Sequence, residues 1–82
     1  MPDTVEIPLS QMRGGQSGKV VVIQGGRHMN DRLEAMGIRP GRKVTKVSSM
    51  LMRGPVTIKV GTAQLAIGFG MARRIIVEPD NK

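Results

Sequence analysis

Apolar and polar residues alternate with a period of two over two segments in the second half of the chain. Segment 55–60 places valine or isoleucine at positions 56, 58 and 60, and segment 63–67 places apolar residues at positions 63, 65 and 67. This alternation predicts strands with one buried face. Gly61 and Thr62 separate the two segments, so the strands are expected to form a hairpin around a tight turn.

Three further segments have the composition of strands. Segment 19–23 reads Lys-Val-Val-Val-Ile, and its continuous apolar run predicts a strand covered on both faces. In segment 42–48, Val44 and Val47 are the inward candidates, and their spacing of three residues predicts a bulge. Segment 74–78 is expected to form the final strand.

One short helix is predicted near the middle of the chain. Asp31 and Glu34 have the spacing of a capping box, which marks the start of a helix. Met29, Leu33 and Met36 fall on one helical stripe, so we expect them to face the core.

The end of this helix is marked by glycine and proline. Gly37 is expected to take the left-handed conformation that follows the last helical turn. Pro40 prevents the helix from resuming, and Pro40-Gly41 predicts a turn into the next strand. Five residues are therefore assigned structural roles: Leu33, Met36, Gly37, Pro40 and Gly41.

These elements together predict the fold class. About five strands with tight turns and one short helix indicate a mainly β protein, a small SH3-like barrel. The 82 residues are expected to form one domain, because a chain of this length has room for only one small core. We place that core at residues 7–78, with tails at 1–6 and 79–82.

Composition excludes several classes of site. The chain has no cysteine, which excludes disulfides, thiolate metal sites and a cysteine nucleophile. The single histidine, His28, is expected to be exposed at the start of the helix, with too few neighbouring ligands for a metal. No nucleophile and base are paired, so neither an enzyme nor a cofactor is expected. No apolar run approaches the ~20 residues of a membrane span, which favours a cytoplasmic location without membrane insertion.

The formal net charge is +7, from 13 Lys and Arg against 6 Asp and Glu. Such a balance makes nucleic acid an alternative partner. The cations are dispersed along the chain, however, and no Tyr or Trp is present to stack on bases, so nucleic acid is not favoured. Several cations are expected on outward strand positions, either as a solvated face or as a patch for acidic protein surfaces or anionic lipid headgroups. These cations are Arg42, Lys43, Lys46, Lys59 and Arg74.

An apolar segment is predicted at the tip of the hairpin that follows the helix. Met50, Leu51 and Met52 are three consecutive apolar residues, and Arg53 comes next. A loop cannot bury all three side chains, and exposed apolar residues that are grouped together often mark a contact surface. We therefore predict that Met50, Leu51, Met52 and Arg53 bind a partner protein or a second copy of the domain.

The run Arg32-Leu-x-x-Met-Gly-Ile-x-Pro-Gly41, followed by a valine-containing strand, resembles the signature of the FeoA family. The opening run Leu9-x-x-Met-x-x-Gly-x-x-Gly-x-Val-Val21 and the closing segment 55–77 are similar to that family as well. Met52 and Arg53 depart from the loop that is common among its members.

The resemblance implies an SH3-like cytosolic domain associated with the ferrous iron transporter FeoB. On this interpretation the chain is a non-enzymatic accessory domain that binds the cytoplasmic part of a FeoB-type transporter, on the side of its G domain. The resemblance does not itself imply that the chain binds iron. A nucleic-acid-binding barrel and a self-associating scaffold are the alternatives left open.

Overall fold

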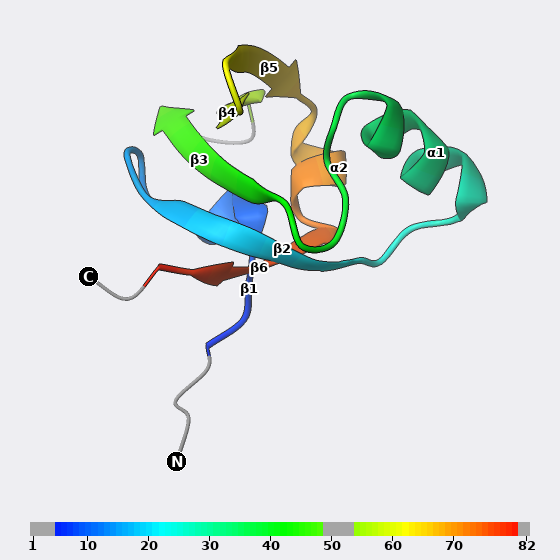
Figure 1. Cartoon of the computed structure of the whole chain (residues 1–82), viewed down its shortest axis with the longest axis horizontal. Coiled ribbons are helices and arrows are strands. Elements are labelled where there is room, and N and C mark those ends of the chain that lie inside the picture. Colours follow the sequence, from blue (N-terminus) through cyan, green and yellow to red (C-terminus); the bar gives the residue numbers. More distant parts are fainter. Residues whose placement is uncertain (1–4, 49–53, 81–82) are drawn as a thin grey trace.

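The computed structural model describes residues 5–48 and 54–80. Six strands form one antiparallel sheet in the order β1-β6-β2-β3-β4-β5 (Figure 1). The strands are β1 (Ile7–Pro8), β2 (Ser17–Ile23), β3 (Lys43–Ser48), β4 (Val56–Val60), β5 (Ala63–Ile67) and β6 (Ile75–Pro79). The helices are a 3-10 turn, η1 (Leu9–Gln11), and two α-helices, α1 (Arg27–Ala35) and α2 (Phe69–Ala72). The expectation of a mainly β fold is confirmed, with the two-residue β1 as an additional strand.

The helix α1 begins earlier than the predicted capping box would place it. Gly26 is the N-cap, in an extended conformation and without a side-chain cap. Asp31 and Glu34 therefore lie inside the helix, and the predicted capping box is wrong. The first turn of α1 instead forms at Arg27, four residues before Asp31, directly after the extended Gly26.

The end of α1 matches the prediction. Gly37 has φ +89°, its N–H donates to the Glu34 carbonyl, and the N–H of Ile38 donates to the Leu33 carbonyl. This pair of hydrogen bonds is a Schellman motif, in which a glycine takes the left-handed position without a side-chain penalty. Leu33 and Ile38 are fully buried, while Met29 and Met36 pack half-buried against the core.

The strand β2 differs from the prediction. Val20 is buried, but Val22 is 42% exposed, so β2 is not covered on both faces. The register with β6 shifts between Val20 and Val22, and such a bulge turns the following side chains to a new direction. In Figure 1, α1 lies beyond the end of β2, on the right.

The strand β3 contains the predicted bulge, but its buried residue is a different one. The register with β4 shifts between Lys46 and Ser48. The period of two continues from Val44 to Lys46, so Lys46 is buried at 3% exposure and Val47 is exposed at 38%. The inward assignment of Val47 and the outward assignment of Lys46 are therefore wrong.

The hairpin of β4 and β5 forms around Gly61 and Thr62 as predicted. The side chains of Val56, Ile58 and Val60 are buried. Burial fades along β5, from buried Ile67 through half-buried Leu65 to exposed Ala63. The prediction for Ala63 is wrong because β5 is an edge strand and Ala63 directly follows the turn.

The core is aliphatic, as the composition requires. Its buried members come from the helices, from every described strand except β1, and from two loops: Leu9, Met12, Val20, Leu33, Ile38, Val44, Val56, Ile58, Val60, Ile67, Ala72, Ile75 and Val77. The short helix α2 contributes buried Ala72 and half-buried Met71. β6 reaches Pro79, one residue past the expected core boundary.

Candidate functional site

A groove of about 350 Å³ lies where the end of β2, the helix α1 and the loop after α1 meet. Its apolar lining comes from β2 and from the loop, whereas α1 contributes polar groups. The lining residues are Val22, Ile23, Asn30, Glu34, Ile38, Arg39 and Pro40.

The groove exists because β3 pairs with only the first part of β2. The paired residues of β2 run from Ser17 to Lys19. At the next position, the N–H of Val20 donates to the Arg42 carbonyl at 2.8 Å and the N–H of Gly41 donates to the Val20 carbonyl at 2.7 Å. Beyond Val20, β2 continues to Ile23 and pairs there with β6. Exposed Val22 lines the opening on the side that β3 does not cover.

One of the lining residues, Asn30, carries an unpaired hydrogen-bond acceptor. The Oδ1 atom of Asn30 is buried and has no hydrogen-bond partner among the described residues. A buried amide oxygen without a donor is costly, and native proteins nearly always pair such atoms. At the rim, Glu34 and Arg39 form an exposed ion pair at 3.9 Å. The apolar part of the lining suits an apolar side chain, and the polar groups of α1 and the loop lie beside it.

The signature residues are brought together beside this groove. Leu33 anchors α1 in the core, Gly37 ends the helix and Gly41, with φ +92°, closes the turn. Pro40 directly lines the groove, and Met36 packs against the core. The geometry of the helix end therefore builds one wall of the candidate site.

Other predicted site residues lie elsewhere. Met50, Leu51, Met52 and Arg53 lie outside the described residues. His28 is exposed on α1. Within the described part of the chain, no group of three or more His, Asp or Glu residues is placed to hold a metal ion.

Lys46 is a buried cation that sequence reasoning placed outside. Its Nζ atom donates to the Ser10 carbonyl at 3.0 Å and to the Met12 carbonyl at 2.6 Å. Burial lowers the pKa of Lys46 from its ordinary value. The side chain thereby holds the η1 turn against β3, which is a structural role. The period of two from Val44 was the signal that could have found it.

Val22 and Asn30 were also missed as site residues. Val22 belongs to a continuous apolar run, which predicts a buried residue. The bulge that exposes Val22 has no marker in the sequence. Asn30 stands next to the core stripe of α1, and nothing in its neighbours identifies an unpaired oxygen.

Among the described helices, none is long and apolar enough to cross a bilayer.

The fold defines a small β domain with a groove beside α1. Comparison with known proteins gives its family. The sequence profile of the FeoA domain matches residues 7–79, and the chain belongs to the FeoA domain family.

Relatives of known name agree with this assignment. A protein of Methanocaldococcus jannaschii, provisionally named Fe(2+) transport protein A, is 35% identical over 71 residues, covering 87% of this chain and 84% of that protein. The crystal structure of an iron uptake regulatory protein, FeoA, superposes with a TM-score of 0.87 at 38% identity, over 93% of this chain and all of that chain.

A third comparison concerns the fold alone. The zinc complex of Stenotrophomonas maltophilia FeoA, described as a prokaryotic SH3 domain protein, has a TM-score of 0.77 at 22% identity. The match covers 92% of this chain and 96% of that chain. The predicted SH3-like fold is thereby confirmed.

Proposed function

We propose that this chain is a non-enzymatic accessory domain of ferrous iron uptake that binds the cytoplasmic part of a FeoB-type transporter, on the side of its G domain. Membership of the FeoA family supports the link to iron transport. The observation that carries the proposal is the groove beside α1, which combines exposed Val22 with the apolar side chains of Ile38 and Pro40. The proposed location is cytoplasmic, where the transporter presents that part.

The groove would take an apolar side chain from a transporter segment. Val22 would be covered on binding, and Ile23, Ile38 and Pro40 would supply further apolar contact. The polar side chains of Asn30 and Glu34, which also line the groove, would offer hydrogen-bond partners to the backbone of the same segment. Apolar anchors in desolvated pockets carry most of the binding free energy at protein interfaces.

The experiment is to measure binding of the Val22→Asp variant to the cytoplasmic part of the transporter by calorimetry. A charge in the groove should weaken binding by about 2 kcal/mol or more, which is about 30-fold. The melting temperature should change little, because Val22 is already 42% exposed.

Val47→Asp is the matched control, since Val47 is a strand valine of similar exposure, 38%, that does not line the groove. It should bind as the unmodified chain does. Leu51→Asp tests the predicted hairpin tip, Met50–Arg53, as the rival contact. Weakening by Leu51→Asp with normal binding by Val22→Asp would refute the groove and favour the tip.

Self-association is measured with the same variants. If the chain forms a dimer that Val22→Asp dissociates, and the transporter does not bind, the scaffold alternative replaces the present proposal.

A further inference from the structure

The outward face of the sheet carries a cluster of cations. Strand register places Lys19 of β2 opposite Lys43 of β3, and places Thr45 of β3 opposite Lys59 of β4. Arg42 directly precedes β3 on the same side. We call Lys19, Arg42, Lys43 and Lys59 the basic face; all four residues are exposed.

Three of these cations surround an open concavity of about 520 Å³. Its lining consists of Gly41, Arg42, Lys43, Thr45, Lys59 and Gly61, and includes no carboxylate. The Arg42 guanidinium lies against the β4–β5 turn, where a Cβ on Gly61 would stand 2.9 Å from its Nη2 atom. The absence of a side chain at Gly61 therefore leaves room for the Arg42 guanidinium against this turn.

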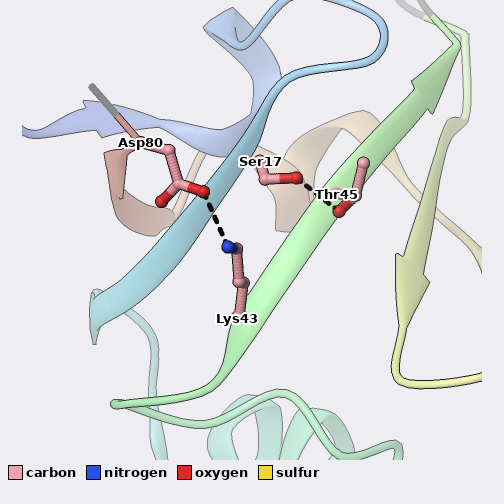
Figure 2. A network of polar contacts seen from close by, with 4 residues as sticks. All are labelled: Ser17, Lys43, Thr45 and Asp80. Carbon is pink, nitrogen blue, oxygen red and sulfur yellow. Dashed lines mark hydrogen bonds and ion pairs between the residues drawn. The ribbon is translucent and has the colours of Figure 1, made fainter. Parts of the chain in front are cut away.

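Acidic residues bound the basic face on one side. Figure 2 shows Lys43 reaching from β3 to Asp80, with 2.8 Å between Nζ and Oδ2, while Ser17 and Thr45 bond to each other at 2.6 Å. Glu78 lies opposite Lys19 in the register of β2 and β6. The positive field is thus confined to the part of the face between β3 and the β4–β5 turn.

We propose that the basic face binds the phosphate headgroups of anionic phospholipids at a membrane surface. The cations are exposed and carried by long, flexible side chains, so they suit many mobile phosphates rather than one fixed ligand. Three of the four are lysines, which are depleted at protein interfaces, and no apolar residue lines the concavity. A protein partner would therefore find no desolvated centre there.

Duplex nucleic acid fits this face less well than a bilayer. A protein that binds through phosphates can use about 6–10 contacts along the helix, whereas this face has four cations, of which Lys43 is paired with Asp80 and Lys19 lies opposite Glu78. A bilayer needs no long continuous track, since each cation near its surface contributes separately. The inference goes beyond the proposed function, and its test requires no transporter.

The test is co-sedimentation of the full chain with vesicles. Vesicles of phosphatidylcholine and phosphatidylglycerol in equal parts should bind the chain, and vesicles of phosphatidylcholine alone should not. Binding should weaken as salt rises. The double variant Arg42→Gln/Lys59→Gln should bind about 25-fold more weakly, at about fivefold for each cation removed.

Two controls separate the basic face from net charge. Arg27→Gln/Arg73→Gln removes the same charge from exposed positions outside the concavity, and should weaken binding far less than the first pair. Asp80→Asn frees Lys43 from its ion pair, and should strengthen binding to anionic vesicles.

Equal losses in the two double variants would overturn the proposal, because net charge would then explain the binding. Absence of binding to anionic vesicles at low salt would overturn it as well. If millimolar inorganic phosphate displaces the chain from vesicles, free phosphate rather than a lipid headgroup is the ligand of the basic face. If the chain binds duplex DNA more tightly than vesicles under the same conditions, nucleic acid is the ligand, and the lipid proposal is overturned.

Discussion

Replacing Lys46 with methionine tests the most unusual contact of the core. The Lys46 side chain is 3% exposed, and its ammonium group donates to the carbonyl groups of Ser10 and Met12. No ion pair involving Lys46 occurs within residues 5–48 and 54–80. Methionine keeps an unbranched, flexible side chain of similar length, so Lys46→Met removes mainly the charge and the donors.

Three contributions set the change in the free energy of unfolding. Each hydrogen bond from a charged group contributes about 1.5–3 kcal/mol, so the two bonds together contribute about 3–6 kcal/mol. Removing the ammonium relieves a desolvation penalty of several kcal/mol. The Met12 carbonyl, however, is then buried without its donor, at a cost of about 1–3 kcal/mol. We expect a net destabilisation of about 2 kcal/mol, or a Tm lower by about 10 °C for a domain of this size.

The assay is urea and thermal unfolding followed by circular dichroism, with Lys59→Met as the control. Lys59 is an exposed lysine on the neighbouring strand β4, so this variant should leave the Tm within about 2 °C of the original, because exposed substitutions rarely exceed 0.5 kcal/mol. A Lys46→Met variant as stable as the Lys59→Met variant would show that the two carbonyl contacts contribute nothing net, and would refute the reasoning.

The pH dependence gives a second, independent measurement. Because burial lowers the pKa of Lys46 below 10.5, the unfolded chain holds a proton that the folded chain has lost, between the lowered value and 10.5. The unfolded state then binds more protons, so the free energy of unfolding rises with pH through that window. Lys46→Met should lack this rise, and a rise of equal size in both proteins would assign it to other groups.

Two further predictions concern the helix and its end. Leu33→Ala removes a fully buried side chain and should lower the free energy of unfolding by about 2–5 kcal/mol; an unchanged urea midpoint would contradict the packing of α1. Gly37→Ala should cost about 1–2 kcal/mol because φ is +89°, and Gly37→Val should cost more. Gly26→Ala, at a negative φ with open space around it, is the control, and an equal loss there would remove the conformational explanation.

The parts of the fold that were predictable are those set by local chemistry. Alternation in β4 identified its buried face, because one side of an antiparallel strand packs on the core. The glycine at 37 ended α1 as expected, since few other residues tolerate that conformation. In both cases the residues that form the sequence pattern are the same residues that determine the local structure.

The errors arise where distant segments decide the outcome. Lys46 is buried because η1, more than thirty residues away, offers two carbonyl groups to its ammonium. Val22 is exposed because a bulge against β6 redirects it. Asn30 borders the groove only once the chain has folded back onto β2. No local pattern contains these long-range contacts, so the candidate groove could not be predicted from the sequence.

One short loop separates the two proposed binding surfaces. Residues 38–40 line the groove, whereas residues 41–42 line the basic concavity. Two backbone hydrogen bonds to Val20 hold this loop against β2 and fix the two surfaces relative to each other. Since the two linings share no residue, a transporter segment in the groove and phospholipid headgroups at the basic face need not compete. Val22→Asp should therefore leave vesicle binding unchanged and Arg42→Gln should leave transporter binding unchanged, because independent sites contribute additively.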